Sequence, residues 1–160
     1  MPQMKCLTLL GTAGDHPQWN HRRSSIGHQV IPLPSEQMVT QAPMISQLIQ
    51  QLGLSIRSVV APAPDMIVDL QERTFNVFHI PAALDSPYIP AQADFVRSFN
   101  IQSVIGLGSI LPSGNLIVII LFSKIPISRS TAELFKPLAL NVKMAVLPFD
   151  RGNVFMPLAS

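Results

Sequence analysis

Two apolar runs in the second half of the chain form its clearest pattern. Residues 101–111 and 116–122 are rich in aliphatic and β-branched side chains, and Pro112-Ser113-Gly114-Asn115 separates them. Gly and Asn tolerate the positive φ that a tight turn between antiparallel strands requires. The pattern therefore predicts a β-hairpin. Because no charged residue occurs from 101 to 122, we expect the hairpin to be central and covered on both faces, or on one face and by an interface.

Apolar side chains recur at helical spacing between Ala42 and Gly53, after a proline that the first turn of a helix tolerates. No charged residue occurs from Gln37 to Ile56. We expect this helix to be half-buried within one domain, or alternatively to contact a partner or to cover a ligand pocket. Shorter helices are expected over 65–73 and 91–99.

A last helix is expected over residues 128–147. Ser130 and Glu133 have the spacing of a capping box, and Ser128 is an alternative cap. Pro137 lies inside the apolar pattern, where it should kink the helix or delay its start.

Three other segments have the composition of strands. Residues 6–12 alternate and end at a glycine, residues 75–80 form a short apolar run, and residues 29–34 form an extended segment whose prolines confine it to an edge or an end. Strands and helices together predict an α+β fold.

The composition is poor in charge, which changes the expected class of protein. Of 160 residues, 12% are charged and 48% are hydrophobic, where an ordinary domain has roughly 25% charged residues. This composition excludes a protein that consists of a disordered tail. We expect one domain over 1–149, followed by a short tail over 150–160. The net charge is +2 with one adjacent basic pair, Arg22-Arg23, so no nucleic-acid partner is expected.

The chain lacks the patterns of exported and membrane proteins. Its longest apolar run, Leu116–Phe122, is far shorter than the ~18–20 residues that span a bilayer. The N-terminus has no apolar signal-peptide core, and the single Cys6 cannot form an internal disulfide. We expect a cytoplasmic protein without membrane insertion.

Candidate chemistry is sparse. His16, His21 and His28 occur in one polar stretch, but their spacing matches no zinc motif. His79, on an expected strand, is a better candidate for a haem ligand or a pocket residue, although a hydrogen-bonded core histidine is the more frequent case. No nucleophile elbow and no phosphate-binding loop occurs. We predict no catalytic residues and no metal site.

The order of several segments resembles that of GAF domains, the small-molecule sensing modules of bacterial signalling proteins. The matching segments are the run from Ile101 to Gly106, the turn at Pro112–Leu116, and Leu138–Val142. More narrowly, the segments Gly11–Asp15, Trp19-Asn20, Gly27-His28 and Ile31–Ser35 look like the GAF-type region of multidomain sensor histidine kinases. Nothing before Cys6 supplies the family's opening helix and first strand.

The resemblance implies a GAF-like or PAS-like antiparallel central sheet flanked by helices. In many GAF domains a pocket lies between the sheet and the middle segments. In this chain those segments contain Phe78, His79, Tyr88, Phe95 and Phe99 as candidate ligand-binding residues. Ordinary core packing is the alternative role for the same side chains.

Three hypotheses of function follow. The first is a non-catalytic sensory or regulatory domain of a bacterial two-component system, which binds a small ligand or relays a signal through dimer contacts, with a second copy or a histidine kinase as partner. The second is a structural dimerisation or interaction domain without a ligand. The third is a haem- or metal-based gas or redox sensor. The residues identify neither the ligand nor a cofactor.

Overall fold

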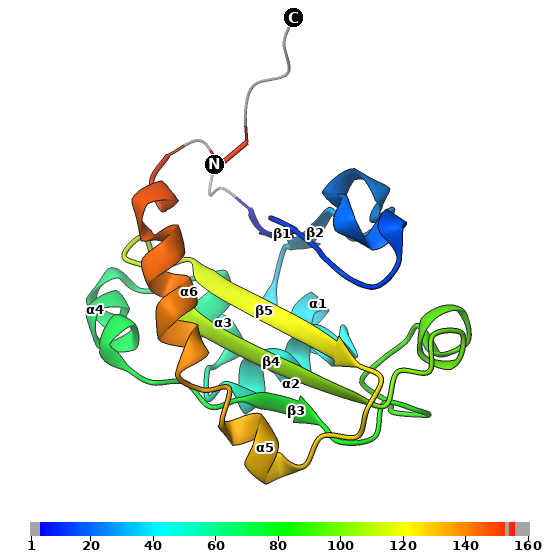
Figure 1. Cartoon of the computed structure of the whole chain (residues 1–160). Coiled ribbons are helices and arrows are strands. Elements are labelled where there is room, and N and C mark those ends of the chain that lie inside the picture. The colour runs from blue at the N-terminus through cyan, green and yellow to red at the C-terminus, as the bar shows by residue number, and fades with distance from the viewer. Residues whose placement is uncertain (1–3, 153, 156–160) are drawn as a thin grey trace, which may run out of the picture.

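A three-stranded antiparallel sheet lies at the centre of the fold, with strand order β3-β4-β5 (Figure 1). The computed structural model describes residues 4–152, 154 and 155, so residues 153 and 156–160 of the expected tail lie outside the described part. The strands are β3 (Phe78–Ile80), β4 (Ser103–Ile110) and β5 (Leu116–Ser123).

The predicted hairpin is confirmed as β4 and β5. Leu111 N donates to Asn115 O at 2.8 Å, and Gly114 has a φ of +82°, as the turn requires. Every residue of β4 is buried, but β5 is the outer strand and its side chains are half-buried or exposed. Only one strand of the hairpin is therefore central.

The first face of the sheet carries the main core, which draws on four helices: α1 (Glu36–Thr40), α2 (Pro43–Gln51), α3 (Ile56–Val60) and α4 (Pro64–Glu72). Packing is close at Gly106, where an added Cβ would lie 2.9 Å from Phe78 Cδ1 and 3.0 Å from Leu48 Cδ1. The uncharged α2 is therefore a core helix, because its apolar side packs onto β3 and β4.

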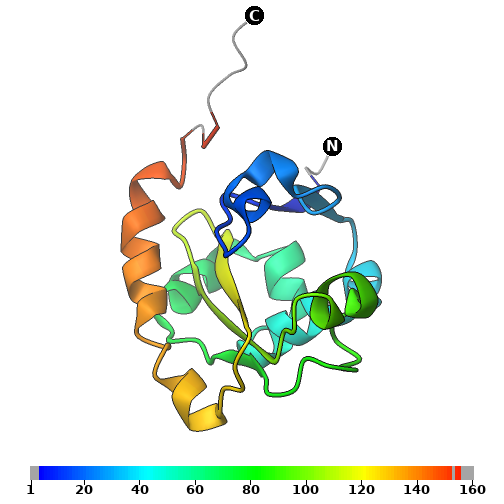
Figure 2. The ribbon, with the colours of Figure 1, turned by 45° about the vertical axis from the view of Figure 1, so that its right-hand side comes forward.

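The second face is covered by α5 (Arg129–Glu133) and α6 (Leu138–Val146). Figure 2 shows the sheet between these orange helices and the cyan helices of the other face. A smaller core of Val77, Ile105 and Ala132 lies here. The single last helix expected from the sequence is two helices, because Pro137 lies in the turn between them.

The cap of α5 differs from the capping-box expectation. Ser128, rather than Ser130, is the N-cap, and its side chain accepts a hydrogen bond from Thr131 N at 3.1 Å. Glu133 does not reach back to the cap but forms an ion pair with Arg129, one helical turn earlier.

The N-terminal segment forms a second, two-stranded sheet. Strand β1 (Lys5–Thr8) pairs antiparallel with β2 (Val30–Leu33), and the 3₁₀ helices η1 (Pro17–Asn20) and η2 (Arg22–Ser24) lie between them. The expected first strand ends at Thr8 instead of residue 12. We call residues 4–33 the N-terminal unit.

The remaining elements follow from local capping. Ser35 and Ser55 cap α1 and α3 by accepting from the backbone N–H three residues later, although neither helix was expected. The 91–99 segment contains a π-helix, η3 (Gln92–Arg97), and α6 continues into η4 (Leu147–Phe149). The α+β class is confirmed, while a GAF-like arrangement stays a prediction. No helix in the described part of the chain is long and apolar enough to cross a membrane.

Candidate functional site

The five predicted ligand-binding residues do not converge on one cavity. Phe78 is fully buried and packs towards α2, whereas His79 is the next residue of the strand and points to the opposite face. Tyr88 is half-buried against the main core. Phe95 and Phe99 lie together at η3. Phe78 belongs to the main core, and Tyr88, Phe95 and Phe99 pack against that core. Ligand binding by the whole set stays a prediction.

His79 is a hydrogen-bonded core histidine that joins three parts of the fold. Its ring Nε2 lies 2.8 Å from Ile127 O, and its backbone N–H donates to Gln51 Oε1, also at 2.8 Å. A carbonyl only accepts, so Nε2 carries the proton in this contact. Coordination of a haem iron through Nε2 would require this hydrogen bond to break.

Metal ligands do not gather elsewhere in the described residues. No group of three His, Cys, Asp or Glu side chains there is close enough to hold a metal ion. His16 packs among aromatic rings, and His28 Nδ1 lies 3.2 Å from Ile26 O. The loop histidines therefore do not form a common site.

An aromatic cluster joins the N-terminal unit to the main sheet. We define it as His16, Trp19, Phe95, Phe99 and Phe122. The Trp19 ring centroid lies 4.4 Å from that of His16 and 4.6 Å from that of Phe99, and the Phe95 and Phe122 centroids are 4.9 Å apart. These edge-to-face contacts are favourable for aromatic rings. Because the rings fill one another's space and are only partly buried, the cluster works as a contact between two parts of the chain.

Local backbone features place Trp19. Pro17 occupies the first turn of η1, and Asn20 accepts a hydrogen bond from Gly14 N at 3.0 Å while donating to Gly14 O at 3.2 Å. A Cβ at Gly14 would lie 2.6 Å from Trp19 Cε3. Only glycine therefore allows the backbone to approach the indole this closely.

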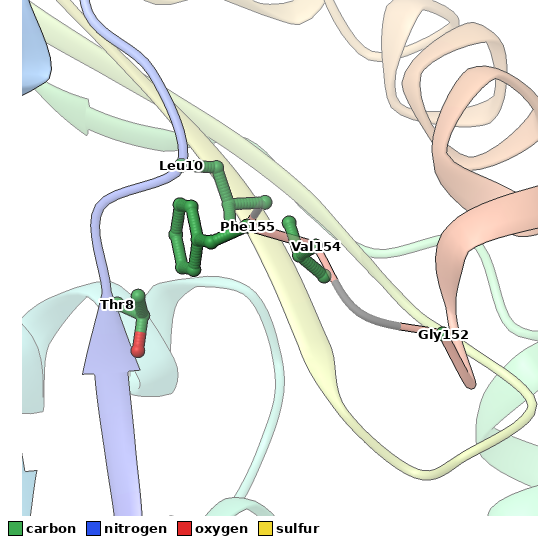
Figure 3. A pocket seen from close by; sticks show the side chains of 5 residues that line it. All are labelled: Thr8, Leu10, Gly152, Val154 and Phe155. Carbon is green, nitrogen blue, oxygen red and sulfur yellow. The ribbon is translucent and has the colours of Figure 1, made fainter. Parts of the chain in front are cut away.

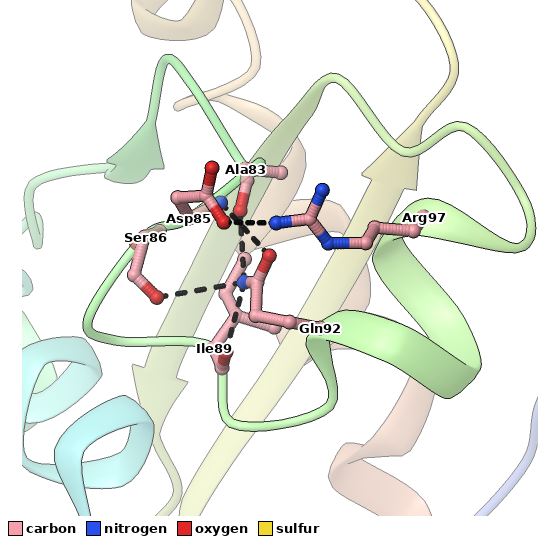
Figure 4. A network of polar contacts seen from close by, with 6 residues as sticks. All are labelled: Ala83, Asp85, Ser86, Ile89, Gln92 and Arg97. Carbon is pink, nitrogen blue, oxygen red and sulfur yellow. Dashed lines mark hydrogen bonds and ion pairs between the residues drawn. The ribbon is translucent and has the colours of Figure 1, made fainter.

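Gln92 places the other side of the cluster by holding the loop before η3 (Figure 4). Its Nε2 donates to Ala83 O at 3.0 Å and to Ile89 O at 2.9 Å, and its Oε1 accepts from Asp85 N at 2.8 Å. Asp85 has a φ of +56° and pairs with Arg97 of η3. One glutamine thus satisfies the backbone of a turn-rich loop and fixes the helix that carries Phe95.

A polar contact lies beside the cluster. Lys124 Nζ donates to Asp15 Oδ2 at 2.8 Å, just beyond the end of β5. The hydrogen bond from Lys124, and then its positive charge, lower the pKa of the Asp15 carboxyl. Both side chains are exposed, so the pair is a tether at the surface and not a buried catalytic dyad.

A shallow pocket lies between β1 and the C-terminal segment (Figure 3). It has a volume of about 340 Å³ and is lined by Thr8, Leu10, Gly152, Val154 and Phe155. A second shallow pocket, of about 440 Å³, is lined by Ile26, Gly27, Gln29 and Val30. None of the five predicted ligand-binding residues lines either pocket.

The outer side of α6 is apolar although it faces solvent. Leu140, Met144 and Leu147 share one side of the helix at i, i+4 and i+7 spacing, and they are 62%, 60% and 37% exposed. The one charged residue of α6, Lys143, points away from this side, because its Nζ donates to Gln71 O at 2.8 Å. We define the α5–α6 face as these residues together with exposed side chains near both ends of α6: Leu134, Leu138, Leu140, Met144, Leu147 and Phe149.

Sequence reasoning identified Phe95 and Phe99 but missed their partners Trp19 and Phe122, since no local pattern links Trp19 to a segment about 80 residues away. It also treated α6 as an ordinary amphipathic helix. A signal was present, because eight of the nine residues Leu138–Val146 carry no charge.

Comparisons of the chain with models of protein families, with curated proteins and with solved structures found no match.

Proposed function

We propose that this chain is a non-catalytic sensory or regulatory module that relays a signal through contacts between two copies of itself. The observation that carries the proposal is the α5–α6 face. Leu140, Met144 and Leu147 are large apolar side chains that lie exposed on one side of a helix there. Contiguous apolar patches of this kind are typical of protein–protein contact sites.

The chemistry of the α5–α6 face favours a second copy as the partner. In a two-fold dimer the same patch meets itself, so the patch has to be complementary to its own copy. A charged patch would place like charges opposite one another, which costs several kcal/mol. The exposed half of α6 avoids this cost because Leu140, Asn141, Met144, Ala145 and Leu147 carry no charge.

The packing of α6 is suited to a helix–helix contact. Ala145 and Asn141 are small and lie beside Leu140 and Met144 on the exposed half of the helix. Alternating large and small side chains create the ridges and grooves through which helices pack at about 8–10 Å. Two α6 helices can therefore approach closely across a two-fold axis.

The ligand-binding part of the hypothesis has less support than the dimer contact, because Phe78, His79 and Tyr88 are used in packing or hydrogen bonds. A structural dimerisation domain without a ligand would use the same α5–α6 face. The resemblance of residues 11–35 to sensor histidine kinases favours a cytoplasmic two-component system, with a kinase as the output of the signal.

Sedimentation velocity tests the proposal with a matched pair of variants. Met144→Lys places a charge in the centre of the α5–α6 face, whereas Met66→Lys makes the same change on α4, where Met66 is 46% exposed. Over about 1 to 100 µM we expect dimers for the wild type and for Met66→Lys, and at least a roughly tenfold weaker Kd for Met144→Lys.

Two results would overturn the proposal. The first is a wild-type chain that sediments as a monomer over the whole concentration range. The second is an equal effect of the two lysine substitutions, which would mean that α6 has no special part in the association.

A further inference from the structure

The outer strand β5 has a free backbone edge. In an antiparallel hairpin, hydrogen-bonded and non-hydrogen-bonded residue pairs alternate. Leu111 N donates to Asn115 O, so counting from this pair, the backbone groups of residues 117, 119, 121 and 123 bond to β4. The N–H and C=O groups of the four residues between them point away from the sheet: Leu116, Val118, Ile120 and Phe122. In the part of the chain that the structure describes, no backbone hydrogen bond reaches these outward groups.

This edge lacks the features that usually prevent strands from pairing. Leu116–Ser123 is eight residues long and contains no charge, no proline and no glycine. Natural proteins protect such edges with lysines, prolines or bulges, or by covering them with another segment. The edge of β5 is thus able to pair unless something covers it.

A segment of the chain itself covers the edge. We call residues 5–20 the N-terminal strap. Asn115 immediately precedes β5, and its Oδ1 accepts a hydrogen bond from Lys5 Nζ at 2.8 Å. Lys124 immediately follows β5, and its Nζ donates to Asp15 Oδ2 at 2.8 Å. The strap therefore runs along β5 in the same direction, and Figure 1 shows the blue segment beside this strand.

The strap covers β5 without pairing with it. Its strand β1 bonds to β2, and Leu9 N donates to Gln29 O at 2.9 Å, so its backbone partners lie within the N-terminal unit. What holds it in place is the aromatic cluster, the two polar ties and the packing of Leu7 on the main core, which Leu33 of the paired strand β2 also enters. The Lys124 and Asp15 side chains are 43% and 73% exposed, and exposed ion pairs contribute little to stability. No backbone hydrogen bond joins the strap to β5, so the part of the strap that follows β1 can leave this strand while β1 stays paired with β2.

We propose that the N-terminal strap is a releasable cover, and that the edge of β5 beneath it pairs antiparallel with β5 of a second copy. The uncharged strand meets its own copy without like-charge repulsion. If Leu116 pairs with Phe122 of the second copy, and Val118 with Ile120, every outward backbone group is satisfied. This register places Ile119 opposite Ile119 of the second copy on the two-fold axis.

Disulfide cross-linking tests the register and the cover together. In a Cys6→Ser background, Ile119→Cys places two thiols in a non-hydrogen-bonded pair, where Cβ atoms are about 4.5–5.5 Å apart. The strap is loosened by Lys5→Ala with Lys124→Ala, which removes both side-chain donors. We expect copper-catalysed oxidation to give a disulfide-linked dimer at least about tenfold faster than with the strap intact.

Ile117→Cys is the matched control on the same strand and the same face. In the proposed register the two thiols introduced at position 117 are four residues apart along the strands, about 13 Å, so no cross-link is expected. Salt on the order of 1 M shortens the Debye length to about 3 Å and so weakens the Lys124–Asp15 tie without substitutions.

Three outcomes would overturn the proposal: no cross-link at position 119 with the strap loosened, an equal rate with the strap intact, or an equal rate at position 117. The contact does not depend on the α5–α6 face. Cross-linking at position 119 is therefore expected to persist in a Met144→Lys background. Its loss there would show that pairing at the β5 edge depends on the α5–α6 face, and would also overturn the proposal.

Discussion

The Lys124 ammonium donates a 2.8 Å hydrogen bond to the Asp15 carboxylate and so joins the end of β5 to the N-terminal strap. The hydrogen bond and then the charge of Lys124 lower the pKa of Asp15 from its ordinary value of 3.8. Because the pKa is lower in the folded than in the unfolded state, the stabilisation is present above pH 3.8 and is lost as the pH falls through the folded pKa.

We predict that an NMR titration of the Asp15 carboxyl gives a pKa below 3.8 in the wild type, and that Lys124→Gln returns it towards that value. The amide of glutamine keeps a donor but removes the charge. Identical titration curves in the two proteins would show that the tether does not persist in solution.

Trp19 is the only tryptophan of the chain, and it contacts both His16 and Phe99. We predict that Trp19→Ala lowers the free energy of unfolding by about 1–3 kcal/mol, less than for a fully buried aromatic residue because Trp19 is half-buried. Trp19→Phe keeps one ring in the cluster and should cost less. Urea unfolding followed by circular dichroism measures both, and an alanine variant within about 0.5 kcal/mol of the wild type would contradict the cluster's role.

Gln92 makes hydrogen bonds to the backbone at Ala83, Asp85 and Ile89. Gln92→Leu keeps a similar size but leaves these groups without partners, so we predict a loss of about 2–4 kcal/mol in the free energy of unfolding. Gln41→Leu changes an exposed glutamine and serves as the control. Equal unfolding free energies for the two variants would mean that the loop does not depend on Gln92.

Gly106 and Gly11 offer a contrast within one residue type. A Cβ at Gly106 would press on Phe78 and Leu48, so Gly106→Ala should destabilise the fold by about 1–3 kcal/mol. Gly11 has no heavy atom within 4 Å of its Cβ position and no positive φ. Gly11→Ala should be neutral or stabilising, by up to about 1 kcal/mol. A lower denaturant midpoint for Gly11→Ala than for Gly106→Ala would contradict the close packing of β3 and α2 around Gly106.

Local patterns in the sequence predicted the elements whose causes are local. The β4–β5 hairpin follows from two apolar runs around Pro112–Asn115, and α2 follows from a proline and helical spacing. The absence of charge in the hairpin did not reveal that β5 is an outer strand, because an edge covered by another segment is as poor in charge as a central strand. The break at Pro137 was visible, but two helices were not expected.

Contacts between distant segments had no local signal. The packing of Trp19 on Phe99 joins positions 80 residues apart, and nothing near either residue indicates its partner. Phe78 and His79 were assigned to one pocket although neighbouring residues of a strand point to opposite faces. The apolar outer side of α6 is present in the sequence, but it becomes informative only when the structure shows which side packs on the sheet.

Native mass spectrometry of the wild-type chain tests the central claim most directly, because it reports the number of copies and any retained small molecule together. We expect a species of twice 17.5 kDa at micromolar concentration, which Met144→Lys converts to the monomer. A wild-type chain found only as a monomer, with no retained ligand, would contradict the claim that this module acts through contacts between two copies.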